Sequence, residues 1–462
     1  MPLPDTTPPD GPASPPGPTS LTLRPRHQHF PLLHVRLFLR AVLQLPASLR
    51  AAAAIFPLLC EEGLASADAW EGPSAPCGRW WLLRVGLYEL QRPKEHADDW
   101  IWFVDHTIQL GTIRVLLIVG VRLSAWEAKG RGALEHGDLQ VILLEPVEKS
   151  NAEVVQSQLN KAAQVTGVPQ AIIYDQCREL NNGGRQFQTD HPQTLCLNDI
   201  KHRLALLLEH RLKPDPRWAD FTQACQQMRK KSQQTALAFL APPATKEKAR
   251  FMNLGELIGW ATTMRKFLDR PAMPPGVPLD RQRLEDVFGT LRQFDAERSE
   301  WQSLVDLIDV AMHHVRQNGY YRGCDEALRR QLTPLASNEA AESFVEQVVS
   351  FVAEQTAPLA FGKHVPGTSE VIESLIGKGK RLEGQQSKGG FTRMVLGLAA
   401  AVVHPTNDYL QQALESVRTK HVVQWARQHL GHSLQGLRQQ TLGHLAAEQK
   451  RDKQLALPSP NF

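Results

Sequence analysis

A change in the period of the hydrophobic pattern constrains the fold of this chain more than any other feature. Three segments near the centre are rich in β-branched and aromatic residues and are bounded by turn residues, as strands of a buried sheet are. The predicted strands cover 100–110, 113–123, 139–147, 170–175 and 194–199, and the predicted helices between and after them cover 151–167 and 200–212. A Gly-rich loop, "NNGGRQ", is predicted between the fourth and fifth strands. Three consecutive strands followed by a strand–helix–strand unit predict a mixed five-stranded sheet flanked by helices, an α/β core.

The rest of the chain is typical of helices. The predicted organisation is a Pro-rich disordered tail at 1–25, a helical region at 26–92, the α/β core at 93–212, an all-α insertion at 213–365, a final core helix at 366–405 and a basic helical region at 406–462. Three helical stretches within 26–92 indicate a helix-turn-helix module with Arg79 and Arg84 facing DNA. The alternative is a small helical bundle in which the aromatic residues of this stretch form the core.

The charge is unevenly distributed although the net charge is only +4. Residues 11–60 contain five arginines and no acid, and residues 374–462 contain twelve Lys or Arg against five Asp or Glu. Basic ends predict a polyanionic partner, with ordinary solvated charge as the alternative. Six cysteines without C-x-x-C spacing predict neither a zinc site nor disulfides, which fits a cytoplasmic protein. The longest apolar runs are too short to span a bilayer, so no membrane is expected.

Two aspartates close predicted strands that should be neighbours in the sheet. Asp105 ends the first strand in "WFVDHT", and Asp175 ends the fourth in "IIYDQCREL". Glu373, in "TSEVIESLIGKGKRLEG", lies on the helix that returns to the sheet after the insertion and could supply a third carboxylate. Three carboxylates at one sheet edge favour Mg²⁺, and two such ions suit an in-line phosphoryl displacement.

Each of these acids also has an ordinary structural interpretation. An aspartate that closes a strand often caps the next turn, and a glutamate beside lysines is often solvated. Asp98, Asp99, Asp190 and Asp199 lie in loops or at strand ends without comparable apolar flanks, so they are weaker candidates. The G-x-S-x-G, H-E-x-x-H and P-loop motifs do not occur, which leaves hydrolase, zinc-protease and P-loop functions without support.

The segments "WFVDHT", "IIYDQCREL" and "TSEVIESLIGKGKRLEG", in this order after a predicted helix-turn-helix, resemble the DDE transposases of bacterial insertion sequences. The resemblance implies an RNase H-like catalytic core interrupted by a large insertion before the last catalytic helix. It implies that Asp105, Asp175 and Glu373 hold two Mg²⁺ ions, for which Mn²⁺ can substitute. The implied activity is the cleavage of DNA at the terminal repeats of an insertion sequence, followed by strand transfer.

The same resemblance implies how the protein meets DNA. Lys380, seven residues after the glutamate, matches the lysine that contacts DNA near the cleaved phosphate, and Lys378 and Arg381 beside it are further DNA-binding candidates. Double-stranded transposon ends and target DNA are the implied partners of a homodimer associated with the bacterial nucleoid. Insertions of this kind often stack an aromatic residue on a flipped base, for which the available residues are Trp260, Trp301, Tyr320 and Tyr321.

The chain departs from one subgroup of these enzymes and leaves two alternatives open. Some cut-and-paste members have a tyrosine seven residues and an arginine four residues before the glutamate, where this chain has Pro366 and Ser369. One alternative is a DNA-binding protein derived from a transposase, either inactive or domesticated. The other is an RNase H-like nuclease or resolvase that cuts DNA without strand transfer.

Overall fold

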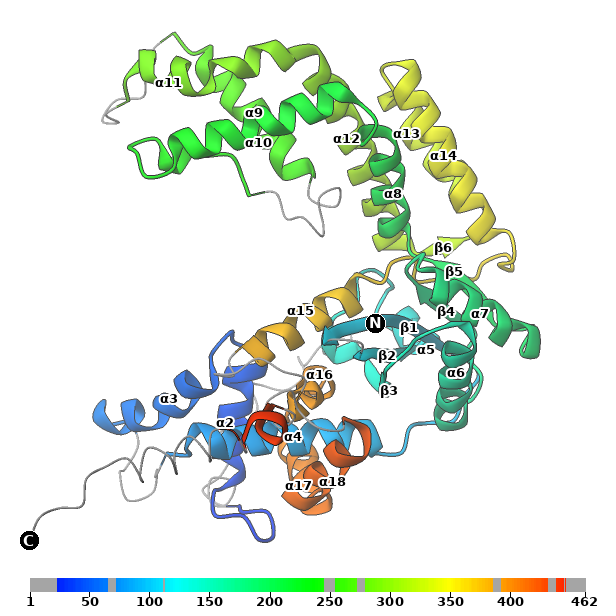
Figure 1. Ribbon diagram of the computed structural model, residues 1–462. Helices are drawn as coiled ribbons and strands as arrows, with labels where there is room; N and C mark the ends of the chain where they lie inside the picture. The colour runs from blue at the N-terminus through cyan, green and yellow to red at the C-terminus, as the bar shows by residue number, and fades with distance from the viewer. Residues whose placement is uncertain are drawn as a thin grey trace, which may run out of the picture.

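The computed structural model describes residues 23–64, 72–110, 113–244, 254–271, 279–384, 392–430, 438–443 and 445. Residues 1–22 and most of the tail after 430 lie outside this description, so the predicted disorder of 1–25 stays a prediction. Figure 1 shows the sheet at the centre, with one helical group on one side of it and the insertion on the other.

One mixed sheet of five strands forms the α/β core. Its strands are β1 (Trp100–Leu110), β2 (Ile113–Arg122), β3 (Gln140–Val147), β4 (Ala171–Tyr174) and β5 (Leu195–Asn198). The spatial order is β3-β2-β1-β4-β5, with β1–β2 and β2–β3 antiparallel and β1–β4 and β4–β5 parallel. The predicted mixed sheet and the predicted pairing of the first and fourth strands are therefore confirmed.

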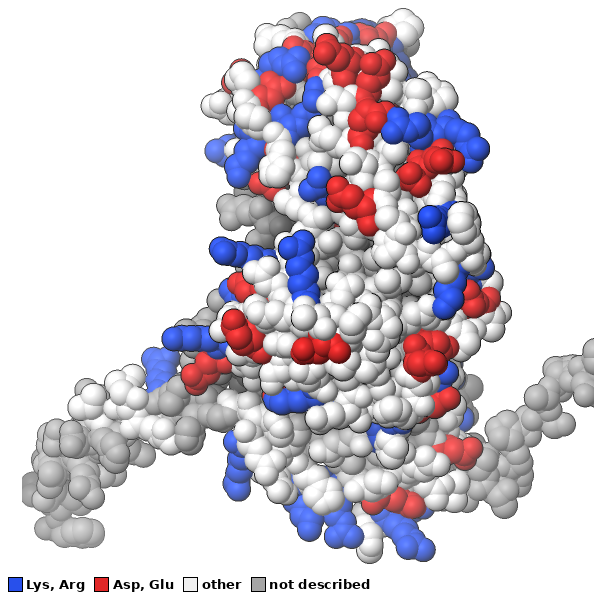
Figure 2. All heavy atoms as spheres, turned by 90° about the vertical axis from the view of Figure 1, so that its right-hand side faces the viewer, with Lys and Arg blue, Asp and Glu red and all other residues white. Residues whose placement is uncertain are grey.

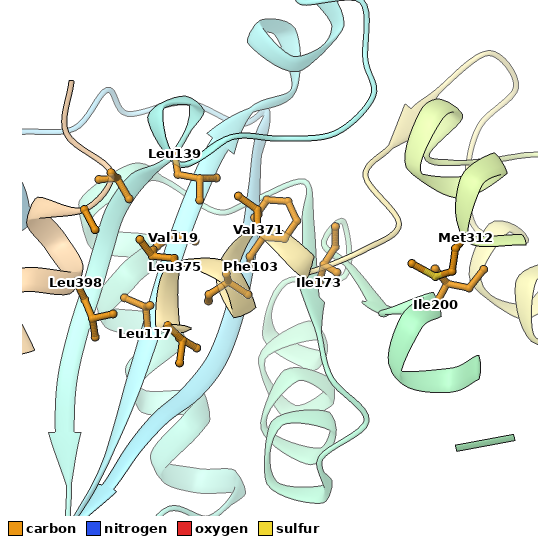
Figure 3. Packing of buried hydrophobic residues seen from close by; sticks show 14 of the residues in the cluster. Phe103, Leu117, Val119, Leu139, Ile173, Ile200, Met312, Val371, Leu375 and Leu398 are labelled. Atoms are coloured by element: carbon orange, nitrogen blue, oxygen red, sulfur yellow. The ribbon is translucent and has the colours of Figure 1, made fainter. Parts of the chain in front are cut away.

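The two faces of the sheet are covered by different helices, because successive side chains of a strand point to opposite faces. Trp100 and Trp102 of β1 belong to a core shared with α6 (Ala152–Thr166) and α7 (Arg178–Asp190). Phe103 faces the other way. Figure 3 shows it beside Val371 and Leu375 of α15 (Glu370–Gly384), the helix that returns after the insertion.

The predicted Gly-rich loop "NNGGRQ" is wrong, because this segment lies inside helix α7. A Cβ atom on Gly183 would lie 2.5 Å from Cβ of Val155 on α6, and one on Gly184 would lie 2.9 Å from the Tyr174 ring on β4. The glycines therefore allow α7 to approach its neighbours closely, and they do not mark a turn.

Helices from the N-terminal part and from the C-terminal part of the described chain pack together on the α15 face of the sheet. They are α2 (Leu32–Leu43), α3 (Leu49–Glu61), α4 (Ala75–Gln91), α16 (Leu396–Ala400), α17 (Asn407–Ser416) and α18 (Thr419–His429). Ser48 caps α3 by accepting a hydrogen bond from the backbone N–H of Ala51, as its sequence position indicates. At the level of this group, Figure 2 shows several Lys and Arg side chains gathered at the lower end of the molecule, whereas acidic and basic side chains alternate over the insertion.

The insertion is almost entirely helical. Helix α8 (Ile200–Leu212) leads into it from the core, and it contains α9 (Pro216–Ser232), α10 (Leu254–Leu268), α11 (Arg281–Phe288), α12 (Asp295–Asn318), α13 (Cys324–Leu332) and α14 (Glu339–Thr356). It is not all-α, because β6 (Tyr320–Tyr321) pairs with β7 (His364–Val365) just before α15. This short ribbon brings the end of α12 close to the start of α15. No helix among the described residues combines the length and apolarity needed to cross a membrane.

Candidate active site at the sheet edge

Asp105 and Asp175 follow the last paired residues of two strands, at the same edge of the sheet. The last residue pair between the parallel strands β1 and β4 is Val104 with Tyr174, and the two aspartates come directly after it. Asp105 has the same parity on β1 as Phe103, so its side chain points to the face that α15 covers. Asp175 also accepts a hydrogen bond from the backbone N–H of Cys177 at 3.1 Å, which starts the turn into α7.

The charges of Asp175 and Glu373 both act on the carboxyl group of Asp105. Burial, and next the charge of Asp175, raise the pKa of Asp105 to about 7. The charge of Glu373 raises this pKa further, whereas His202 lowers it. A carboxyl group whose pKa is raised by neighbouring carboxylates lies close to them, without enough positive charge between the groups. Asp105 therefore lies near both Asp175 and Glu373, and the role of the three acids as one catalytic site stays a prediction.

Glu373 lies in the first turn of α15, and two cationic side chains from α8 hold its carboxylate. Nζ of Lys201 lies 2.6 Å from Oε2 of Glu373, and Nε2 of His202 lies 3.4 Å from Oε1. Oε1 is buried and accepts no hydrogen bond within the described residues. Val371, Ile372 and Leu375 are buried around it, so this acid stands beside the packed face of its helix.

Sequence reasoning set Asp199 aside as a weaker candidate and missed His202. Asp199 is fully buried, and its carboxylate accepts hydrogen bonds from four groups. The donors are the backbone N–H of Lys201, the backbone N–H and the hydroxyl group of Ser369, and Nδ1 of His202. Burial alone would lower the pKa of His202, but Asp199, Glu373 and Asp175 raise it to about 9, so the imidazole is cationic at neutral pH. The available signal was an aspartate directly after a strand with a histidine one helical turn later, "DIKH".

Whether this site can bind a metal ion depends on carboxylate oxygens that accept no hydrogen bond. Asp199, His202 and Glu373 offer ligand atoms within 4.8 Å of one another, whereas the predicted trio of acids does not meet this limit among the described residues. We regard Asp199 as a structural acid, because four donors already occupy its oxygens. The orphaned oxygen of Glu373 and the crowded carboxyl of Asp105 fit Mg²⁺, which prefers oxygen ligands.

Three predicted DNA-binding residues lie on the second half of α15. Lys380 and Arg381 are exposed, so both are accessible to a phosphate backbone. Lys378 is half-buried, and its ammonium donates a hydrogen bond to the backbone carbonyl of Ala401 at 3.1 Å. Burial and the neighbouring Arg381 lower the pKa of Lys378 to about 8. Lys378 therefore fastens α15 to the segment that follows α16, and its DNA-binding role stays a prediction.

The prediction that Arg84 faces DNA is wrong. Its side chain is only 6% exposed, and its guanidinium donates hydrogen bonds to the backbone carbonyls of Val417 and Leu414. Trp81, Leu82 and Val85 are buried around it, so this part of α4 is a core element and cannot enter a DNA groove. The helix-turn-helix assignment stays a prediction.

Arg79 is half-buried at the start of α4 and lies near a second arginine. The guanidinium of Arg393 lies 4.8 Å from the centre of the Trp80 ring, and burial together with the charge of Arg79 lowers the pKa of Arg393. Neither arginine forms an ion pair with an acid in the described part of the chain. Of the aromatic residues proposed for base stacking, Trp301 and Tyr320 are fully buried and cannot reach DNA.

The fold and site define an α/β protein with helical insertions and an acidic site at one edge of its sheet. No protein-family model matches the sequence, and no curated protein matches it. Among solved structures, a Drosophila P element transposase strand transfer complex is similar at 11% sequence identity and a TM-score of 0.39, over 79% of this chain and 90% of that chain. A similarity of this size identifies neither the fold family nor the function.

Proposed function

We propose that this protein is a DDE transposase with an RNase H-like core, which cleaves DNA at the ends of an insertion sequence and transfers the strand. The observation that supports it best is the convergence of Asp105 and Asp175, from neighbouring parallel strands, with Glu373, from the helix that follows the insertion. Carboxylates crowded to this degree are costly to bury unless a cation compensates them.

The three acids are the proposed ligands of two Mg²⁺ ions. When bound, the ions would activate the attacking oxygen and stabilise the leaving oxygen of an in-line displacement at phosphorus. Glu373 is the proposed third ligand in preference to Glu370, because the charge of Glu373 raises the pKa of Asp105, whereas Arg316 donates hydrogen bonds to both oxygens of Glu370. Buried contacts of Val371 and Leu375 with the sheet hold the helix, and with it the carboxylate, at the edge.

The chain's own cations have separate proposed roles. Lys380 and Arg381 lie exposed beyond the acid on the same helix, where they can hold the phosphate backbone next to the scissile bond. His202 points Nε2 at the acids while Asp199 fixes its ring, so it can donate a proton or hydrogen bond to a phosphate oxygen that arrives there. Assembly as a homodimer on paired DNA ends belongs to this proposal.

The test is a cleavage assay with the full-length protein and DNA that carries the sequences flanking its gene. We expect strand cleavage and joining to a target plasmid in Mg²⁺ or Mn²⁺, and none in excess EDTA. Scrambled DNA of equal length is the control for sequence recognition. Specific binding without cleavage in either metal would favour the non-catalytic DNA-binding protein, and cleavage without joining would favour a nuclease.

A further inference from the structure

Lys201 holds the carboxylate that the proposed reaction requires. Its ammonium lies 2.6 Å from Oε2 of Glu373 and 3.4 Å from Oε1 of Glu370, one turn earlier on α15. All three side chains are about one-quarter exposed, so their charges interact more strongly than those of a fully solvated pair. One ammonium therefore stands between two carboxylates and is closer to Glu373.

Arg316 is placed to control how Lys201 divides its charge between the two glutamates. It lies at the end of α12, the longest helix of the insertion, and binds Glu370 through two hydrogen bonds of 2.6 Å, from Nε to Oε2 and from Nη2 to Oε1. A bidentate arginine–carboxylate pair is the strongest of the common charge-assisted contacts. Because Arg316 already neutralises Glu370, Lys201 is left to pair with Glu373.

The insertion and the acidic site are mechanically connected at this point. Figure 3 shows Met312 of α12 beside Ile200 of α8, directly before Lys201. The backbone N–H of Ile200 donates a hydrogen bond to the carbonyl of Gly367, two residues before Ser369, and Ser369 binds Asp199. A cavity lined by Trp126, Pro366 and both members of the Arg316–Glu370 pair gives the arginine space to leave the carboxylate.

We propose that Lys201 is a positioning residue that competes with divalent metal for Glu373, and that Arg316 sets the strength of this competition. When Arg316 leaves Glu370, that glutamate attracts Lys201, and Glu373 becomes available to the metal. A movement of the insertion would thus change metal affinity at the sheet edge. The inference rests on the proposed function only in taking Glu373 as a metal ligand.

The test measures the affinity of the full-length protein for Mn²⁺ in the absence of DNA. Electron paramagnetic resonance of the free ion gives the concentration of unbound Mn²⁺. We expect Arg316→Ala and Lys201→Gln each to tighten Mn²⁺ binding by roughly threefold to tenfold, and Glu370→Gln to weaken it. Arg316→Lys keeps the charge but loses the bidentate fork, so it should tighten binding to a smaller extent. Glu373→Gln should abolish the change in Mn²⁺ affinity caused by these substitutions, which would identify Glu373 as the ligand concerned.

Two controls separate this mechanism from a structural effect and from simple electrostatics. Arg329 forms a more exposed bidentate pair with Glu346 in the same insertion, so Arg329→Ala removes an arginine–carboxylate pair away from the acidic site and should leave Mn²⁺ affinity unchanged. In the Lys201→Gln background, Arg316→Ala should have no further effect, because the arginine acts through the lysine.

The outcomes distinguish this inference from the function beneath it. If Mn²⁺ binds but Arg316→Ala does not change its affinity, or changes it equally with and without Lys201, the competition mechanism is wrong and the metal site stands. If neither the wild-type protein nor Lys201→Gln binds Mn²⁺, the proposed metal site and this inference both fail.

Discussion

Asp105 and Asp175 come directly after the last paired residues of two neighbouring parallel strands, so the backbone register itself places their carboxylates at one edge. Each of these acids alone has an ordinary structural role available to it. Their joint effect is different, because the charge of Asp175 adds to burial in raising the pKa of Asp105 to about 7. A site of this kind stores electrostatic repulsion that a cation can relieve.

The three acids should be needed for chemistry but not for DNA binding. We expect Asp105→Asn, Asp175→Asn and Glu373→Gln each to reduce strand cleavage by at least roughly 10³-fold, because each removes a metal ligand. Affinity for the terminal DNA should change by less than about threefold in a gel-shift assay, since phosphate contacts come from cations. Cleavage by any one variant at more than a few per cent of the wild-type rate would remove that residue from the metal site.

The metal-free protein should lose stability as the pH rises from about 4 to about 7. In this window folded Asp105 keeps a proton that the unfolded chain has released, so the free energy of unfolding falls with increasing pH. Asp105→Asn should therefore match the wild type at about pH 3.5, below the pKa of the unfolded chain, and exceed its stability by about 1–3 kcal/mol at pH 8. The measurement is urea unfolding in EDTA, with Asp98→Asn, at an exposed acid, as the control for a lost charge.

His202 acts in the same direction but over a higher pH range. Its raised pKa of about 9 means that its contribution to stability is complete below pH 6.5 and is lost as the pH rises to about 9. Equal pH profiles for Asp105→Asn and the wild type would show that the carboxyl of Asp105 titrates normally.

The sheet could be predicted from the sequence because its signal is local. Apolar runs rich in β-branched residues identify the strands, and the order of strands and helices limits the topology, so the adjacency of the strands that end at Asp105 and Asp175 followed directly. Lys201 and His202 could not be placed in the same way. Their role depends on the contact of α8 with α15, elements separated by the whole insertion.

The errors of prediction have a common physical cause, which is that residue type does not reveal burial. Arg84 was taken for a surface cation, but carbonyl groups of a helix more than three hundred residues later satisfy its guanidinium. Gly183 and Gly184 were taken for turn residues, but they serve the close approach of α7 to its neighbours. Both roles are set by tertiary contacts that the local sequence does not contain.

Arg84 should matter for stability and Arg79 should not. Arg84→Ala would leave two buried carbonyls without donors, so we expect a loss of about 2–4 kcal/mol in the free energy of unfolding. Arg79→Ala, at a half-buried position on the same helix, should cost less than about 1 kcal/mol. Chemical denaturation followed by tryptophan fluorescence measures both. Equal losses for the two variants would contradict the buried role of Arg84.

Arg79 and Arg393 should contribute to DNA binding without sequence preference. Two neighbouring guanidinium groups without an acidic partner among the described residues favour a phosphate, whose charge relieves their repulsion. We expect each alanine variant to lower affinity equally for terminal and scrambled DNA and to reduce the slope of log K against log salt by about 0.9. Fluorescence anisotropy at several salt concentrations tests this, with Arg329→Ala as the control. An unchanged slope would show that these arginines only pack against Trp80.

The contact of α4 with α16 should be one of the least tolerant places in the protein. A Cβ atom on Gly86 would lie 2.0 Å from the backbone carbonyl oxygen of Leu396, and backbone cannot move aside as a flexible side chain can. Gly86→Ala should therefore destabilise the protein by about 2–4 kcal/mol, although alanine favours a helix. Gly259 is the matched control, because it lies inside helix α10 and a Cβ there meets nothing within 4 Å. Gly259→Ala should stabilise the protein by about 0.5–1 kcal/mol. Urea unfolding of both variants decides the matter: if Gly86→Ala is as stable as the wild type, α4 does not lie against α16 at this distance, and the buried position assigned to Arg84 would have to be abandoned with it.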